Sequence, residues 1–168
     1  LGDKDLSWGS NLIHSPNEPH LEQALVDLYL KEGVKKISAS AFMQLSPAIV
    51  RYACSGLSYD GKTIHRRNRV FAKISRPELA RQFMSAAPKK ILLHLVKEKL
   101  LTPQEAKLAE YIPLSEDISV EADSAGHTDN QVLGALFPAV VSVRNKVLKS
   151  FKLKPHIRIG AAGGIGSP

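Results

Sequence analysis

Residues 118–131, ISVEADSAGHTDNQ, decide how this chain is organised. They begin with a short apolar run at residues 118–120, which predicts a buried strand, and continue into a loop of small residues. Within nine positions the loop carries four titratable side chains: Glu121, Asp123, His127 and Asp129. A strand that opens into a turn of Ser, Ala and Gly with a histidine is how α/β proteins place chemistry at the carboxyl end of a strand. The stretch therefore predicts an α/β fold with a functional site at this strand end.

Outward from this stretch, apolar runs and amphipathic segments alternate along the chain. Five runs predict strands: residues 8–13, 34–40, 69–74, 118–121 and 157–162. The segments between them predict helices: residues 21–32, 47–54, 76–85, 88–101, 103–111 and 131–151. In the first helix the apolar positions are spaced i, i+3, i+4, i+7, and Gly33 follows in the expected C′ position. Strands that alternate with helices predict a parallel sheet.

Local signals mark where several of these helices begin. Ser46, Ser75 and Thr102 are expected to be N-caps, and Glu105 stands at the N3 position that completes a capping box with Thr102. Pro138 lies inside the last helical segment, where it is expected to kink the helix or divide it in two.

Two segments depart from simple alternation. The crossover between the strands at 69–74 and 118–121 holds about three helices where a parallel crossover needs only one, so we predict that residues 86–116 are a helical insertion. Residues 59–68, YDGKTIHRRN, contain an Asp-Gly turn signal and predict an exposed loop or a small hairpin.

The net charge of the 168-residue chain is +7, and it is unevenly distributed. Residues 58–107 carry 12 Lys and Arg against 4 Asp and Glu, so the whole excess lies in the middle of the chain. Such a segment is either an ordinary solvated surface or a binding surface for an acidic protein or a phosphorylated ligand. Nucleic acid is disfavoured because the segment has few aromatic residues and no nucleic-acid-binding motif.

Cysteine usage and hydropathy indicate a cytoplasmic location. Cys54 is the single cysteine, which excludes an internal disulfide, fits a reducing compartment and predicts a packing role. No apolar run approaches the roughly 20 residues that span a bilayer, and no signal peptide is visible, so no membrane partner is expected. The chain begins with Leu1, which is expected of a processed chain or of a piece of a longer one.

Three further strand ends carry residues suited to binding. Asn11 follows the start of the first strand, and its amide can offer donors and an acceptor to a planar polar ligand or merely satisfy loop backbone. Lys73 lies in an apolar strand, where it marks either a pocket with a partner such as Asp123 or an exposed sheet edge. Gly163 and Gly164 end the last strand, and their backbone N–H groups can hold a phosphate or simply form a turn.

The four titratable residues of the opening stretch also allow a divalent-metal site. Against this alternative, no second cluster of histidines or carboxylates stands at another strand end. The favoured interpretation of the stretch is therefore acid–base work without a metal.

Taken together, the strand ends resemble the TIM-barrel family of FMN-dependent enoyl reductases and nitronate monooxygenases (2-nitropropane dioxygenase-like). The family's A-G-G-H motif is similar to Ser124-Ala125-Gly126-His127, with Ala125 in place of a glycine found in many members. Its A-A-G-G-I strand end is similar to residues 161–165, and its G-V-N-x strand to residues 9–12. The runs NLIHSPNEP, SASAFMQLSPAIVRY, NRVFAKISRPE, EADSAGHTDN and GAAGGIG most resemble the enoyl reductases of polyunsaturated-fatty-acid synthases and trans-acyltransferase polyketide synthases.

The resemblance implies a partial TIM (β/α)8 barrel, with about five parallel strands and a helical insertion. A complete barrel typically needs about 250 residues. By comparison with the family, residues 8–13 correspond to strand 3 and residues 157–162 to strand 7. The whole chain is then the central part of a flavin-binding barrel, with the remaining strands outside it.

The resemblance also implies a chemistry. NAD(P)H reduces FMN, which passes hydride to an α,β-unsaturated thioester on an acyl carrier protein. His127 matches the family's active-site histidine, which donates a proton or hydrogen-bonds the thioester carbonyl. The expected cofactor-binding residues are Asn11 and Lys73 at the flavin ring, Asp123 as partner of Lys73, Gly126 beside the flavin face, and Gly163 and Gly164 at the phosphate. Glu121 and Asp129 are expected to have structural or rim roles.

Acyl carrier proteins are acidic, so the basic residues 58–107 are a candidate docking surface for a carrier protein or another part of the synthase. The residues chosen to test this by charge reversal are Arg66, Arg67, Lys89 and Lys90. Two alternatives stay open: a nitronate monooxygenase-type flavin oxidase, and a non-catalytic fragment that binds carrier protein. With three strands absent, we expect the isolated chain to hold FMN poorly.

Overall fold

The computed structural model describes residues 8–126, 128–152 and 155–165. His127, the predicted catalytic residue, lies outside the described residues. The main sheet has five strands: β1 (Ser10–Ile13), β2 (Lys36–Ser40), β5 (Arg69–Ile74), β6 (Asp117–Glu121) and β7 (Arg158–Ala162). The helices are α1 (Pro19–Lys31), α2 (Pro47–Cys54), α3 (Pro77–Met84), α4 (Lys89–Lys97), α5 (Pro103–Ala109) and α6 (Leu133–Leu148). Every predicted strand and helix is present, with ends shifted by at most four residues.

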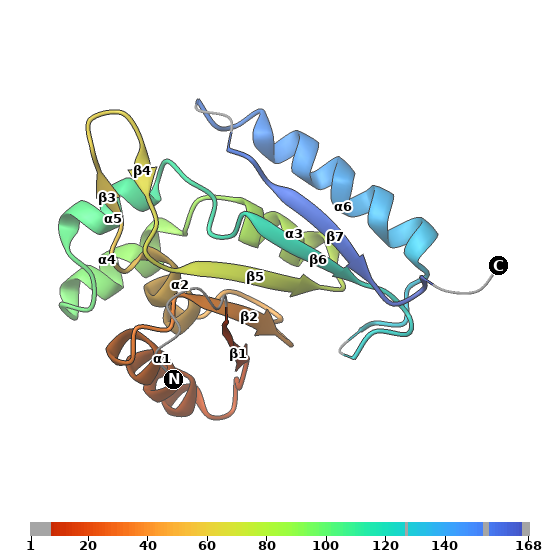
Figure 1. The fold of residues 1–168 in the computed structure, drawn as a ribbon, viewed down its shortest axis with the longest axis horizontal. Helices are drawn as coiled ribbons and strands as arrows, with labels where there is room; N and C mark the ends of the chain where they lie inside the picture. The colour runs from red at the N-terminus through yellow and green to blue at the C-terminus, as the bar shows by residue number, and fades with distance from the viewer. Residues whose placement is uncertain (1–7, 127, 153–154, 166–168) are drawn as a thin grey trace.

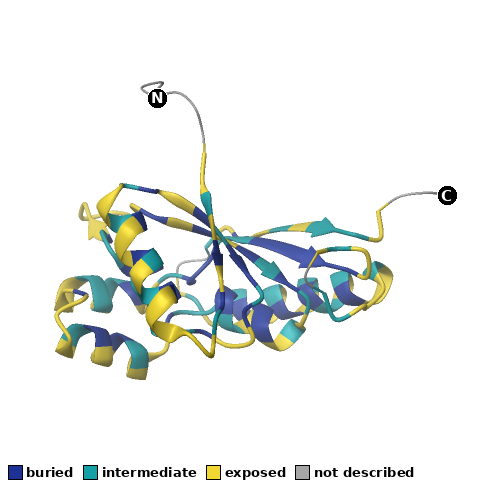
Figure 2. Ribbon diagram, turned by 90° about the horizontal axis from the view of Figure 1, so that it is seen from below, coloured by how far each residue is buried: buried dark blue, intermediate teal, exposed yellow. Residues whose placement is uncertain are grey.

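The strand order of the sheet is the order of the chain, β1-β2-β5-β6-β7, and every pair in it is parallel (Figure 1). A doubly wound sheet reverses its strand order at a switch point, whereas a barrel adds each strand on the same side. The helices lie on one side of the sheet, as Figure 2 shows. These features confirm an α/β fold that forms an arc of a (β/α)8 barrel.

The register of the strands separates the sheet into two unlike faces. The helix-facing side is apolar and buried, and its residues include Leu12, Ile37, Ala72, Ile118 and Val120. On the opposite face no described helix packs, and this is the side that lines the interior of a closed barrel (Figure 2). We call it the open face.

Small and polar side chains make up much of the open face. One row across it contains Asn11, Ser38 and Phe71. The next row toward the carboxyl ends contains Ser40 of β2, Lys73 of β5 and Ser119 of β6. Lys73 therefore lies on the central strand β5, so the alternative that placed it on an exposed edge strand is wrong.

Two of the three predicted N-caps are confirmed. Ser46 accepts a hydrogen bond from the Ile49 backbone N at the start of α2. Thr102 and Glu105 form a reciprocal capping box at the start of α5.

The third predicted N-cap, Ser75, is wrong. The N-cap of α3 is Arg76, without a side-chain capping bond, because the residue before Pro77 is held in the extended region at φ −133° and ψ 130°. The hydroxyl of Ser75 instead donates to Asp129, 2.6 Å away on the loop before α6.

Of the two expectations for Pro138, a kink or a division of the last helix, division is wrong, since α6 continues through Pro138. The kink stays a prediction. The proline lies in the second turn of α6, close to the helix start. There the absent N–H removes only one hydrogen bond near the first turn, where several N–H groups lack an intrahelical partner in any case.

Helices α4 and α5 lie within the predicted insertion, and the predicted hairpin is confirmed as the antiparallel pair β3 (Ser58–Tyr59) and β4 (Ile64–His65). Both lie at the amino ends of the sheet strands (Figure 1). The Gly56 N–H, just after the end of α2, donates to Glu105 of α5 over 2.6 Å, which ties the insertion to this end of the molecule.

Candidate functional site

The predicted site residues come from four strands of one sheet. Asn11 lies on β1 and Lys73 on β5, while Asp123 and Gly126 follow β6 and the two glycines follow β7. Because the strands are parallel, the loops after β6 and β7 lie at the same edge of the sheet (Figure 1). The fold thus gathers these residues at the carboxyl ends and on the open face.

The side-chain amide of Asn11 is held by two serines of the neighbouring strand. The hydroxyls of Ser38 and Ser40 donate to its Oδ1 over 2.5 Å and 2.7 Å. Among the described residues its Nδ2 group makes no hydrogen bond. An open groove of about 610 Å³ is lined in part by Asn11, Ser38 and Phe71, and Lys73 does not line it.

The backbone of Asn11 is also fixed. The hydroxyl of Tyr29 on α1 donates to the Asn11 carbonyl over 2.8 Å, and the Ser10 hydroxyl donates to Tyr29 over 3.0 Å. These bonds connect the first strand to the helix behind it. The Asn11 side chain therefore projects from a constrained segment of backbone.

The predicted ion pair between Lys73 and Asp123 is wrong. Lys73 is half-buried on the open face and, within the described part of the chain, its ammonium has no hydrogen-bond or ion-pair partner. Asp123 is exposed, and its Oδ1 accepts from the Ser124 backbone N over 2.8 Å. The carboxylate lies instead near Gly164, where an added Cβ would come within 3.3 Å of Oδ1. Asp123 stands two residues beyond the end of β6, so the turn carries it to β7 instead of β5.

The two glycines after β7 pack closely against the loop after β6. Gly163 has φ +76°, and a Cβ added there would lie 2.6 Å from the Ala125 backbone N and 3.0 Å from the Ser124 carbonyl carbon. The Gly164 N–H donates to the Ser124 hydroxyl over 2.7 Å. The glycines are therefore required by the close approach of two loops, and one of the two expected phosphate donors already has a partner.

Gly126 differs from these two glycines, because a Cβ added there would meet no atom within 4 Å. The described residues thus place no steric demand for glycine at this position. Its predicted role beside a flavin stays a prediction.

The other carboxylates of the opening stretch are engaged elsewhere. Glu121 is buried on the open face and accepts from the Ser119 hydroxyl over 2.7 Å. Asp129 forms a two-pronged ion pair with Arg76, at 2.6 Å and 2.8 Å. The hydrogen bonds from Arg76, followed by that from Ser75, lower the pKa of Asp129 to about 2. Among the described residues no three His, Cys, Asp or Glu side chains gather as metal ligands would.

One polar cluster was missed by the sequence analysis. Buried His14, after β1, contacts Glu22 of α1 at 2.9 Å and stacks on Phe42, with ring centroids 4.8 Å apart. The Ser46 hydroxyl donates to the other Glu22 oxygen. Glu22 thereby joins the starts of α1 and α2 to the end of β1, beside a pocket of about 230 Å³. The run NLIHSPNEP contained His14 and Glu18, but no spacing in it indicated the contact with Glu22.

Three known proteins are similar to this chain in sequence or in structure. The polyketide biosynthesis protein PksE of Bacillus subtilis is 43% identical over 167 residues, or 98% of this chain. A polyunsaturated fatty acid synthase protein of Thraustochytrium is 42% identical over 164 residues, or 96% of this chain. The crystal structure of the enoyl reductase domain of MlnA, from the macrolactin biosynthesis cluster of Bacillus amyloliquefaciens, matches 95% of this chain with a TM-score of 0.86 and 36% identity. The chain is thus similar to proteins of polyketide and polyunsaturated fatty acid biosynthesis and to one solved enoyl reductase domain.

This chain corresponds to only part of those proteins. It spans 22% of PksE, 11% of the Thraustochytrium synthase protein and 36% of the MlnA domain chain. No family model matches it. In the described residues no helix is long and apolar enough to cross a membrane.

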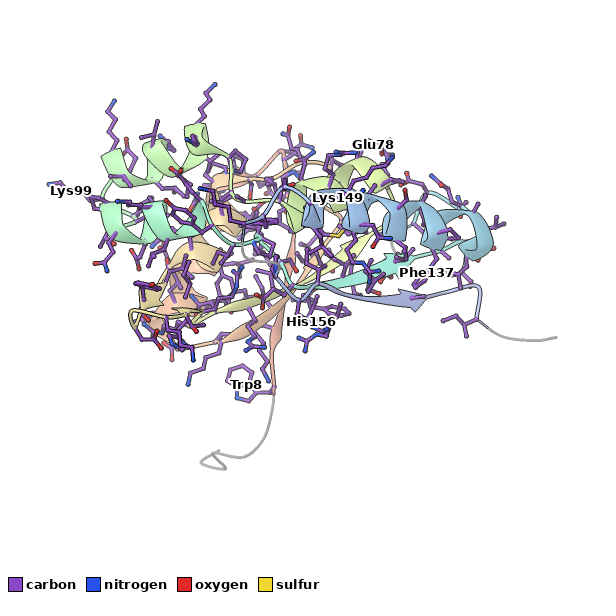
Figure 3. All side chains as sticks on the ribbon, turned by 90° about the horizontal axis from the view of Figure 1, so that it is seen from above. Trp8, Glu78, Lys99, Phe137, Lys149 and His156 are labelled. Carbon is purple, nitrogen blue, oxygen red and sulfur yellow. The ribbon has the colours of Figure 1, made fainter. Side chains whose placement is uncertain are left out.

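The basic residues of the segment 58–107 differ in their exposure. Arg66 has a side chain that is only 8% exposed; its guanidinium donates to the carbonyls of Pro113 and Leu114 and lies 3.5 Å from Glu116. It anchors the hairpin to the segment before β6, so its selection as a docking residue is wrong. Lys89 and Lys90 are exposed on α4, at the amino ends of the strands. Figure 3 shows Lys99, just beyond α4, at the opposite end of the molecule from Phe137 of α6.

Proposed function

We propose that the chain is part of a flavin-dependent enoyl reductase that acts on α,β-unsaturated thioesters in polyketide or polyunsaturated fatty acid synthesis. The observation that carries this proposal is the pair of donors on the open face, Asn11 and Lys73, in a chain homologous to a solved enoyl reductase domain. An amide NH2 and an ammonium suit a ligand whose edge carries acceptor atoms and negative charge.

The residues present fit FMN at this position. When bound, FMN supplies a carrier that accepts hydride from NAD(P)H and gives it to the substrate. Asn11 and Lys73 would hold the acceptor edge of the ring. At the β6 and β7 loops, a phosphate would compete with the Ser124 hydroxyl for the Gly164 N–H. Gly126 would leave room beside the ring.

His127 is proposed as the residue that donates a proton toward the α-carbon or binds the thioester carbonyl. A histidine has an ordinary pKa of about 6.5 and can serve either purpose near neutral pH. In the sequence His127 follows β6, and barrel enzymes place catalytic residues after the carboxyl ends of their strands.

The test uses the full-length protein that contains this chain. The purified protein is expected to bind FMN and to consume NADPH when given an enoyl thioester. A His127→Ala variant should keep the flavin absorbance and lose reductase activity. Oxygen uptake with a nitronate, without NADPH-dependent enoyl reduction, would favour the oxidase alternative. Absence of flavin binding and turnover would favour a non-catalytic module.

We propose further that the basic insertion binds an acyl carrier protein or a neighbouring part of the synthase. The exposed Lys89 and Lys90 support this, because acidic surfaces are attracted to such residues. The insertion lies at the amino ends, about 17 Å along the strands from the catalytic loops, so it is suited to anchoring a partner rather than to presenting its thioester. Charge reversal at both lysines should weaken partner binding at low salt, while Arg66 must be left intact. Unchanged binding would contradict the docking proposal.

A further inference from the structure

Helices α4 and α5 pack side by side at the amino ends of the sheet strands and leave an open groove between them (Figure 1). The groove has a volume of about 380 Å³. Its lining runs from Lys89 to Val96 on α4 and from Pro103 to Glu110 on α5. On each helix the lining residues are spaced i, i+3, i+4 and i+7, so each helix presents one continuous face to the groove.

The floor of this α4–α5 groove is apolar. It is formed by Leu92, Leu93, Val96, Pro103 and Ala106. Leu92 is only 3% exposed, whereas Leu93 projects beside it with 71% of its surface exposed. The opposite side of both helices is already covered, because α4 and α5 pack against α2. A concave apolar strip between two helices is a surface on which the apolar face of a third helix can pack.

The charges around the α4–α5 groove are mostly positive. Residues 88–111 hold five lysines and three glutamates. Glu105 is taken by the capping box of α5, and Glu110 pairs with Lys89 at 3.5 Å. Both side chains of this pair are exposed, so the pair is weak and can be exchanged for a carboxylate of a partner. Lys107 also lines the groove and forms no ion pair within the described residues.

Size and charge together select the occupant. Helix α4 has nine residues and α5 has seven, so at 1.5 Å per residue the groove is long enough for about two turns of a helix. A second copy of this face is disfavoured, because it would set lysine against lysine. A small phosphorylated ligand would leave the apolar floor uncovered. The surface fits instead a helix whose apolar stripe lies between rows of carboxylates.

We propose that the α4–α5 groove binds an acidic amphipathic helix of another protein of the synthase. The apolar stripe of that helix packs on Leu93, and its carboxylates lie beside Lys89 and Lys107. This inference rests on the docking role proposed above for the basic insertion, and it adds the place and the chemistry of the contact. Because a contact of about two helical turns is small, the binding is transient and is weakened by salt.

The experiment uses the full-length protein that contains this chain and two fluorescent peptides of about 20 residues, a length at which helices form. The acidic peptide carries leucines at i, i+3, i+4 and i+7, glutamates on both sides of the leucines and alanine elsewhere. The basic peptide has lysine in place of each glutamate. Fluorescence anisotropy at low salt measures the affinities. The acidic peptide is expected to bind about tenfold or more tightly than the basic one.

Variants of the full-length protein then test the floor and the rim of the groove. Leu93→Ser removes the apolar contact without adding charge and should weaken acidic-peptide binding about fivefold or more. Leu93→Met is the matched control, because it keeps an apolar side chain of similar size and should bind as the wild type does. Lys107→Glu should weaken binding, whereas Lys31→Glu, on the last turn of α1 and outside the groove lining, should not. Circular dichroism checks that each variant is folded.

The outcomes separate this inference from the docking proposal. Unchanged affinity of Leu93→Ser for the acidic peptide overturns the groove, while loss of partner binding on charge reversal at Lys89 and Lys90 would leave the docking proposal standing. Equal binding of the two peptides, or binding of neither, also overturns the groove as the site of an acidic helix. A dimer of the full-length protein that Leu93→Ser dissociates would place a second copy in the groove and overturn the proposed occupant.

Discussion

Replacement of Gly163 by alanine tests the close approach of the two loops that form the candidate site. The new Cβ would meet only backbone atoms, at 2.6 Å, 3.0 Å and 3.2 Å, and backbone cannot rotate away as a flexible side chain can. The left-handed φ of +76° costs an alanine about 1–2 kcal/mol. Overpacking of this kind costs about 1–3 kcal/mol more. We therefore expect Gly163→Ala to lower the free energy of unfolding by about 2–5 kcal/mol.

Two other glycines separate these contributions. Gly33 has φ +68° with no atom within 4 Å of an added Cβ, so Gly33→Ala should lose only the conformational part, about 1–2 kcal/mol. Gly126 lies in open space, and the free energy of unfolding of Gly126→Ala should stay within about 0.5 kcal/mol of the wild type.

The assay is urea unfolding of the three variants and the wild type, followed by circular dichroism with linear extrapolation. The expected order of stability is Gly126→Ala, then Gly33→Ala, then Gly163→Ala. If Gly163→Ala were no less stable than Gly33→Ala, the loop at residues 122–125 would have to yield freely. The close approach would then not be what requires glycine at position 163.

Three further predictions concern the scaffold. Asn68→Ala should lower the free energy of unfolding by about 1–3 kcal/mol in urea titrations, because the buried amide donates to two carbonyls at the end of α2. The pKa of Asp129 is lowered by its hydrogen bonds with Arg76, so the ionised carboxylate stabilises the fold fully above the ordinary pKa of 3.8 and loses this contribution as the pH falls toward about 2. Asp129→Asn should therefore reduce the loss of stability between pH 4 and about 2, measured by acid unfolding. An acid unfolding curve identical to that of the wild type would contradict this prediction. Burial raises the pKa of the Cys54 thiol to about 12, so a thiol reagent at pH 8 should label it only after unfolding.

Local structure was predictable wherever the signal and the structure it specifies lie within a few residues. The start of α2 at Ser46 and the capping box of Thr102 with Glu105 are fixed by neighbours three residues apart. Ser75 failed under the same rule because the restriction imposed by Pro77 on the preceding residue moved the N-cap by one position. Even that error was local, and the helix itself formed as predicted.

The positions of the predicted site residues on the strands could be predicted from the sequence, but their contacts could not. The strand ends that carry Asn11, Lys73 and the glycine loop could be read from apolar runs, because parallel strands bring their carboxyl ends to one edge. The pairing of Lys73 with Asp123 was wrong, since a turn of two residues beyond a strand can carry a side chain toward either neighbour. The choice of Arg66 as an exposed docking residue was wrong because its side chain is held by carbonyls 47 and 48 residues away in the chain, which no local pattern indicates.

The sequence by itself determined the five strands, the helices between them, the insertion and the succession of strand ends, because periodicity and capping act over one or two turns of chain. Only the tertiary structure decided which side chains meet across the sheet. Ser38 and Ser40 reach Asn11 because the register of β1 against β2 places them on the same face. A shift of one residue would turn both serines toward the helices and leave the Asn11 amide unheld.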